Sequence, residues 1–119
     1  MRELLQFYVN GRWVDPEMPS KLDVINPATE EPCGSISLGN AKDVGKAVAA
    51  AKAAADSFAA SSRKDRLELL LAILDGISAR ADEIATAIME EMGAPYRLAQ
   101  AAHVPAGAQH FRTALEVLE

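Results

Sequence analysis

The sequence predicts an α+β fold in which short β-hairpins occupy residues 1–40 and a helical block occupies residues 41–119. Two observations indicate this order. An Asn10-Gly11 pair lies between apolar residues, and both positions accept the positive φ that a two-residue hairpin turn requires. From residue 62 to residue 92, apolar residues instead recur at the spacing of three and four that marks one face of a helix. The chain is therefore expected to change from strands to helices near residue 40.

Four short strands are expected before residue 40. The first two flank the Asn10-Gly11 turn. The third ends at Asn26-Pro27, because proline lacks the N–H that a ladder hydrogen bond requires. The expected strands cover residues 6–9, 12–14, 22–25 and 33–38.

Two pairs of polar residues mark the starts of helices. Asn40 is followed three residues later by Asp43, and Ser62 is followed at the same spacing by Asp65. In each pair the first side chain can accept hydrogen bonds from the first helical turn, and the second can bind the backbone of the first. Helices are therefore expected over residues 41–60 and from residue 62 onward.

Several residues in the helical block favour breaks. Polar residues near position 80 are expected to divide the 62–92 stretch into two helices, and Gly93 is expected to end the second in the left-handed conformation. The last segment is expected to begin at Pro95 and to be interrupted at Pro105 and Gly107. The block is thus predicted to be a series of packed helices.

Composition excludes several classes of protein. The 119 residues include 12 Lys and Arg against 17 Asp and Glu, a net charge of −5, so no nucleic-acid partner is expected. No apolar run approaches the roughly 20 residues of a membrane span, and the polar start is unlike a secretion signal. The single cysteine, Cys33, excludes an internal disulfide. We therefore expect no membrane partner and a cytoplasmic location.

A series of short motifs occurs in the order found at the start of one enzyme family. They are the hairpin at residues 7–14, the turn Asn26-Pro27-Ala28-Thr29, the helix at 41–60, Arg66 in the leucine-rich helix, residues 79–85, and Met92-Gly93-Ala94-Pro95. Together they resemble the opening of an NAD(P)-dependent aldehyde dehydrogenase. The resemblance covers nearly all of this chain and about the first quarter of such an enzyme. Glu30 and Glu91 depart from the commoner Gly and Asp, which bears on the substrate class.

The resemblance implies an N-terminal fragment whose main partner is the remainder of the enzyme. Such enzymes oxidise an aldehyde to a carboxylic acid with NAD or NADP, using a cysteine thiolate and a glutamate-activated water. The residues matching that thiolate, that glutamate and the dinucleotide-binding turn are expected outside residues 1–119. No catalytic and no cofactor-binding residue is therefore predicted in this chain, which alone is expected to be inactive and to bind no cofactor.

The resemblance also implies how the complete enzyme is built. Residues 41–119 are expected to pack on the dinucleotide-binding domain, and the complete enzyme is expected to be a homo-oligomer, either a dimer or a tetramer. Two other interpretations of the chain are open. It could be a free-standing helical interaction module, or a regulatory partner of a full-length enzyme.

Two sites are implied by the same resemblance. Glu91 and the main-chain carbonyl of Ile25 match positions that hold a structural sodium or potassium ion in some family members. A carboxylate at the negative end of a helix needs a compensating cation, and Arg97 is an alternative to a bound ion. Ala102 and Ala106 match positions at the mouth of the aldehyde tunnel, where small side chains would admit a bulky or aromatic aldehyde. Alanines are also common packing residues in helices.

The remaining nucleophile and metal-ligand candidates are expected to be structural. Cys33 lies in a predicted strand, far along the sequence from either histidine, whereas a reactive thiolate needs a nearby cation or helix start. His103 and His110 are seven residues apart, which is not the spacing of a helical metal pair.

Overall fold

The structure is a computed structural model that describes residues 2–118. Met1 and Glu119, the outer limits of the two predicted regions, lie outside the described residues. The chain divides into two compact units, Met1–Ala60 and Ser61–Glu119, which we call the N-terminal unit and the C-terminal unit.

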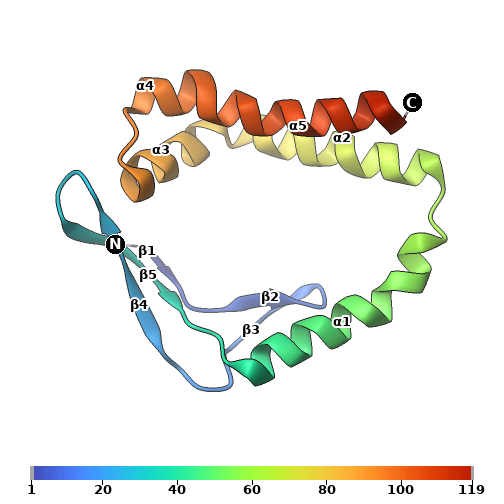
Figure 1. Cartoon of the computed structure of the whole chain (residues 1–119), viewed down its shortest axis with the longest axis horizontal. Coiled ribbons are helices and arrows are strands. Elements are labelled where there is room, and N and C mark those ends of the chain that lie inside the picture. The colour runs from blue at the N-terminus through green and yellow to red at the C-terminus, as the bar shows by residue number, and fades with distance from the viewer. Residues whose placement is uncertain (1, 119) are drawn as a thin grey trace. The chain divides into compact units, whose positions relative to one another are not determined.

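Short strands of the N-terminal unit form two sheets (Figure 1). β5 is the central strand of a three-stranded sheet, parallel to β1 and antiparallel to β4. β2 and β3 form a separate hairpin, and the positive φ angles of Asn10 (53°) and Gly11 (75°) confirm the predicted turn. The strands are β1 (Arg2–Leu4), β2 (Phe7–Val9), β3 (Arg12–Val14), β4 (Lys21–Asn26) and β5 (Glu31–Ser37).

β1 is missing from the sequence prediction, which starts its first strand at residue 6. Its residues are exposed and show no alternation of apolar and polar side chains. Its partner also lies far along the chain, since Arg2 is in register with Gly34. A Cβ atom at Gly34 would lie 3.1 Å from the Arg2 carbonyl oxygen, so glycine permits this close approach. The last strand is predicted over residues 33–38, whereas β5 covers residues 31–37.

α1 (Ala41–Ala59) begins with the predicted capping box. The Asn40 side chain accepts hydrogen bonds from the N–H groups of Lys42 and Asp43 at 2.8 and 3.2 Å, and Asp43 accepts from the Asn40 N–H at 2.9 Å. Asp43 also accepts from the Glu17 N–H at 3.0 Å. The change from strands to helices thus falls near residue 40, but α1 contacts β2 and belongs to the N-terminal unit.

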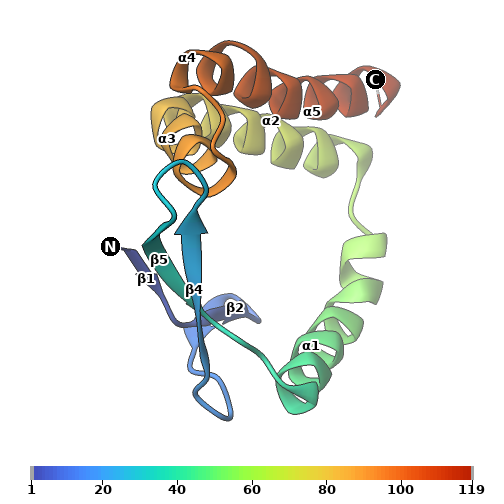
Figure 2. The same ribbon diagram turned by 60° about the vertical axis from the view of Figure 1, so that its left-hand side comes forward.

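The C-terminal unit is built from helices. α5 runs alongside α2 (Figures 1 and 2). A π-helical segment, η1, contacts α3. The elements are α2 (Arg63–Ala79), α3 (Ala81–Met92), α4 (Tyr96–Leu98), η1 (Ala99–His103) and α5 (Val104–Leu118).

The predicted helix ends at residues 62, 80 and 93 are confirmed. Ser62 and Asp65 form a capping box at the start of α2. Arg80, with φ −115° and ψ 21°, separates α2 from α3. Gly93 ends α3 with φ 75°, the left-handed conformation in which a side chain would be strained.

The predicted interruption at Pro105 and Gly107 is wrong, because both residues lie within α5. In a regular α-helix the ring of Pro105 would clash with the carbonyl group four residues earlier. Here the helix widens just before the proline. The Val104 N–H donates to the carbonyl oxygen of Ala99, five residues back, which is the π-helical pattern.

Two apolar clusters form the core of the C-terminal unit. The first joins α2 to α5, and the second joins α3 to η1 and the start of α5. Ile77 packs against both clusters, which makes the core continuous. The face predicted over residues 62–92 is therefore largely covered, although Leu71 and Met92 stay 51% and 65% exposed. The buried residues are Leu74, Ala108 and Leu115 in the first cluster and Ala85, Ala99 and Val104 in the second.

Candidate functional site

The π-helical segment η1 is the most distinctive part of the helical unit. Ala99, its first residue, has no exposed surface, and Val104, just after it, is 8% exposed. Both pack in the cluster that contains Ala85. A regular helix would turn one of two positions five residues apart away from this core, whereas the extra residue of a π turn keeps both inside. The spacing of five between Ala99 and Val104, followed directly by Pro105, is the sequence signal that could have predicted this turn.

Ala102 and Ala106, the predicted tunnel residues, lie on this same stretch of helix. Ala102 belongs to η1 and Ala106 to the first turn of α5. Both are exposed, and neither belongs to the core clusters of the described residues. The structure therefore places two small side chains about one turn apart on an uncovered part of the helix. Their role in a tunnel stays a prediction.

Asp82, which no sequence motif marked as a site residue, connects the start of α3 to η1 through its side chain. One carboxylate oxygen of Asp82 accepts hydrogen bonds from the Tyr96 hydroxyl at 3.2 Å and from the Gln100 side-chain amide at 2.8 Å. Partial burial, and then the hydrogen bond to Asp82, raises the pKa of the Tyr96 hydroxyl, so this hydroxyl stays protonated and donates. The backbone carbonyl of Asp82 accepts from the Thr86 hydroxyl at 2.8 Å.

The two residues predicted to hold a monovalent cation belong to different compact units, so their pairing stays a prediction. Ile25 lies on β4, next to a bulge, and its register partner is Pro32. Proline has no N–H, so the Ile25 carbonyl receives no hydrogen bond from that partner. Glu91 lies in the last turn of α3, as predicted, and is exposed. Main-chain carbonyl oxygens and carboxylates at the negative end of a helix are the kinds of group that can bind an alkali cation.

Cys33 is held within the three-stranded sheet. Its thiol donates to the Val24 carbonyl oxygen on the neighbouring strand, with a distance of 3.3 Å between sulfur and oxygen. Among residues 2–118, no group of three or more His, Cys, Asp or Glu side chains is arranged to hold a metal ion. Over the same described range, no helix combines the length and the hydropathy needed to cross a bilayer.

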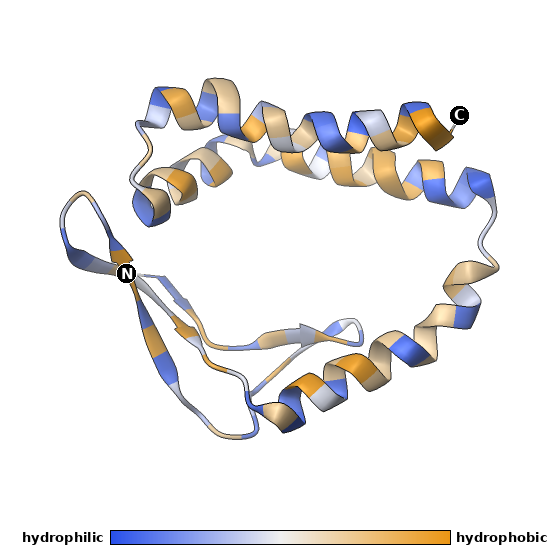
Figure 3. Ribbon diagram, viewed as in Figure 1, coloured by the Kyte–Doolittle hydropathy of each residue, from blue (hydrophilic) through white to orange (hydrophobic). Residues whose placement is uncertain are grey.

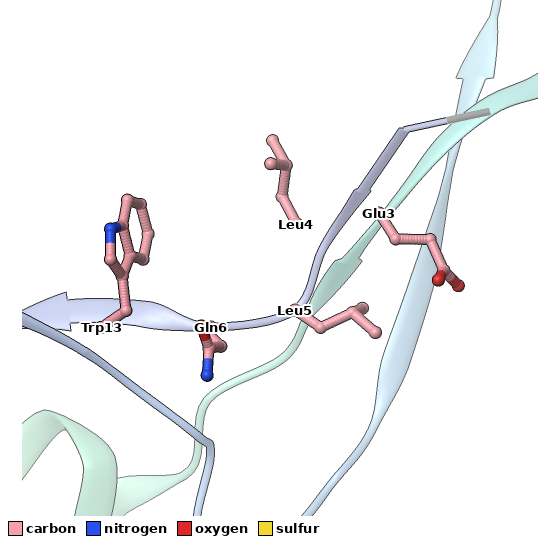
Figure 4. A pocket seen from close by; sticks show the side chains of 5 residues that line it. All are labelled: Glu3, Leu4, Leu5, Gln6 and Trp13. Carbon is pink, nitrogen blue, oxygen red and sulfur yellow. The ribbon is translucent and has the colours of Figure 1, made fainter.

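The N-terminal unit exposes a group of large apolar side chains. The rings of Tyr8 and Trp13 meet edge to face with centroids 5.2 Å apart, yet the two residues are 62% and 63% exposed. Leu4 and Trp13 project to the same side of the ribbon and line a shallow hollow with Glu3, Leu5 and Gln6 (Figure 4). A second hollow lies between β2 and α1, where its lining includes Val44 and Ala47.

Comparison with known proteins identifies the family. Residues 13–119 match the model of the aldehyde dehydrogenase family. The chain belongs to this family and corresponds to about the first quarter of its members. The match favours the enzyme interpretation over a free-standing interaction module.

Individual relatives agree with this assignment. The chain is 46% identical to a 3-succinoylsemialdehyde-pyridine dehydrogenase of a Pseudomonas species, in an alignment covering 99% of this chain and 25% of that protein. Its structure is similar to an aldehyde dehydrogenase from Bartonella henselae, with a TM-score of 0.97, 39% identity, and coverage of 99% of this chain and 25% of the other.

A second solved structure is a variant of aldehyde dehydrogenase C from Pseudomonas syringae in complex with NAD+ and octanal. The TM-score is 0.92 and the identity 41%, over 95% of this chain and 23% of the other. The chain thus spans about a quarter of the length of the relatives it matches, and the predicted α+β fold is confirmed as part of the aldehyde dehydrogenase fold.

Proposed function

We propose that this chain is the N-terminal part of an NAD(P)-dependent aldehyde dehydrogenase that oxidises an aldehyde to a carboxylic acid. The observation that carries the proposal is the family match over residues 13–119, together with 46% identity to a named aldehyde dehydrogenase. NAD or NADP, when bound, accepts the hydride from the substrate. The groups that hold the cofactor and attack the aldehyde come from the remainder of the enzyme, so the 119 residues alone are inactive.

The part played by this chain is to cover the dinucleotide-binding domain through the helical region 41–119. α1 supports this role, because it has no buried residue and yet includes apolar residues along its length (Figure 3). Val44, Val48 and Phe58 are 60%, 48% and 56% exposed. Such an uncovered apolar face is suited to packing against more of the same protein.

The substrate proposed is a bulky or aromatic aldehyde. Exposed Ala102 and Ala106 leave space beside the helix for a large group. Two relatives support a large substrate. One is named for a substrate with a pyridine ring, and the other has a solved structure with octanal bound. Replacing Ala102 with Phe in the complete enzyme should raise the KM for long or aromatic aldehydes more than the KM for acetaldehyde. Equal changes for both aldehydes would contradict the tunnel role.

One comparison tests the activity. The 119-residue chain and the protein extended through the following gene sequence are mixed separately with an aldehyde and either NAD or NADP, and formation of reduced cofactor is measured. The extended protein should form it and should gain thermal stability from one of the two cofactors, whereas the short chain should do neither. Oxidation by the short chain would contradict its assignment as an inactive fragment. No oxidation by the extended protein would contradict the proposed activity.

The complete enzyme is also proposed to be a cytoplasmic homodimer or homotetramer. Sedimentation of the extended protein tests the assembly, and a monomer at all concentrations would contradict it.

The predicted cation site formed by Ile25 and Glu91 has a test of its own. Replacing sodium or potassium with a bulky organic cation should lower the melting temperature of the wild type and leave that of Glu91→Ala unchanged. If the melting temperature of neither protein changed, the Ile25–Glu91 site would be contradicted.

A further inference from the structure

We propose that Asp82 is a positioning residue that fixes the register of η1 and thereby the placement of Ala102 and Ala106. The inference rests on the proposed function, because it assigns these alanines to the aldehyde entrance. Its basis is the shared oxygen of Asp82, which accepts one hydrogen bond from Tyr96 in α4 and one from Gln100 in η1. Asp82 itself belongs to the first turn of α3.

A π-helical segment has an alternative register that must be excluded. The π turn contains one residue more than an α-helical turn, and removing that excess would rotate the segment by about 100° per residue. Such a rotation by one residue, with the start of η1 held in place, would turn Ala102 away from its present direction and bring its larger neighbour His103 toward the entrance. The position of the small side chains therefore depends on what holds the extra residue in place.

The two ends of η1 are held by different means. At its C-terminal end, Pro105 cannot donate a hydrogen bond and excludes a regular α-helical turn before it. At its N-terminal end, Ala99 is buried against Ala85, but a buried alanine is a small anchor. The hydrogen bonds to Asp82 supply a directional restraint at this end, since they fix both the residue that starts α4 and the second residue of η1.

Glu83 provides a matched control. It lies next to Asp82 in the same first turn of α3, and it pairs with Arg80 at 2.9 Å. Both carboxylates interact with the positive end of the helix, so Asp82→Ala and Glu83→Ala each remove one such charge. Asp82 alone of the two has a hydrogen bond to α4 or η1 among the interactions described for residues 2–118. A difference between the variants therefore isolates the contact with η1.

The experiment uses the full-length enzyme and measures the KM and kcat for octanal and acetaldehyde. Asp82→Ala should raise the ratio of the octanal KM to the acetaldehyde KM about fivefold over that of Glu83→Ala. The kcat for acetaldehyde should be the same in both variants. Asp82→Asn should restore the wild-type ratio, because an amide oxygen can still accept both hydrogen bonds. The pair Tyr96→Phe with Gln100→Met removes both donors and should reproduce the Asp82→Ala ratio.

Hydrogen exchange gives a second readout that does not depend on turnover. Amides of residues 99–104 should exchange faster in Asp82→Ala than in Glu83→Ala, while amides of α2 exchange equally in both. Equal KM ratios, or equal exchange across 99–104, in an active enzyme would overturn the inference. A failure of the proposed function would look different, because the full-length wild type would then oxidise no aldehyde at all.

Discussion

Each of the two compact units is stabilised internally by a different kind of interaction. Among residues 2–60, only Gly34 and Ser35 are buried, and α1 has no buried residue at all. The C-terminal unit has a continuous core in which Leu74, Ala85 and Val104 are 9%, 0% and 8% exposed. The N-terminal unit therefore depends on backbone hydrogen bonds and helix capping, and the C-terminal unit on packed side chains.

This difference indicates which of the two units is closer to being stable without a partner. Small sheets and single hairpins are marginal in water unless an apolar face is covered. The N-terminal unit leaves Tyr8, Trp13 and the apolar residues of α1 exposed, so it is the part that most needs a partner. We propose the remainder of the enzyme as that partner. An isolated 119-residue chain should then self-associate, which sedimentation as a monomer would contradict.

The largest expected effect is a core substitution in the C-terminal unit. Leu74→Ala should lower the free energy of unfolding of the 119-residue chain by about 2–5 kcal/mol, because it leaves a cavity between α2 and α5. Val48→Ala on α1 is the matched change in the N-terminal unit and should cost less than about 1 kcal/mol, since Val48 is 48% exposed. Denaturant unfolding measures both. Similar losses would show that the two units are not stabilised differently.

Replacing a glycine with alanine in each unit tests the effect of backbone strain on stability. Gly11 and Gly93 share a φ of 75°, so alanine at either position should cost about 1–2 kcal/mol through left-handed strain. At Gly11 no other atom would lie within 4 Å of the added Cβ, so backbone strain accounts for the expected cost there. The melting temperatures of the two variants should fall by similar amounts. A fall in only one would mean that the turn in the other unit contributes little to stability.

Helix caps are expected to have a smaller effect. Asn40→Ala and Ser62→Ala each remove the side chain that accepts hydrogen bonds from the first turn of α1 or α2, and each should cost about 1 kcal/mol. Serine at position 40 and asparagine at position 62 are the controls, because both residues can cap a helix. If the serine or asparagine variant were as unstable as the alanine variant, capping would not explain the loss.

The smallest expected effect is a dependence on pH. Hydrogen bonds from the Ser62 side chain and backbone lower the pKa of Asp65, and hydrogen bonds from the Asn40 and then the Glu17 backbone lower that of Asp43. A carboxyl group with a lower pKa in the folded state than in the unfolded state stabilises the fold at pH values above its ordinary pKa of about 3.9. This stabilisation is lost as the pH falls through the lower pKa of the folded state. The melting temperature should therefore drop below about pH 4 in the wild type and drop less in Asp43→Asn/Asp65→Asn. Parallel curves for both proteins would contradict this origin.

Local signals in the sequence predicted the features that depend on neighbouring residues. The capping boxes at Asn40 and Ser62, the Asn10-Gly11 turn and the left-handed Gly93 each depend on a few consecutive residues, and all are confirmed. β1 could not be predicted in this way. Its hydrogen bonds go to a strand about thirty positions later, and nothing in Arg2–Leu4 itself indicates that partner.

The candidate site was predicted only in part. Ala102 and Ala106 were identified through the family resemblance, but the π turn that carries Ala102 was not, because a proline within a helical pattern usually indicates a break. The tertiary core prevailed over this local preference, since Ala99 and Val104 are both buried. Asp82 was missed because an acid in the first turn of a helix is common and its bonds to Tyr96 and Gln100 arise only when the helices pack.

The parallel pairing of β1 with β5 also determines an order of events during synthesis. β1 leaves the ribosome about thirty residues ahead of β5, so the first strand stays without its ladder until Gly34 has also emerged. Bringing β1 and β5 together also costs more chain entropy than closing the two-residue turn of the β2–β3 hairpin. This edge of the sheet is thus completed late, and in the interval the nascent chain exposes β1 as an unpaired strand.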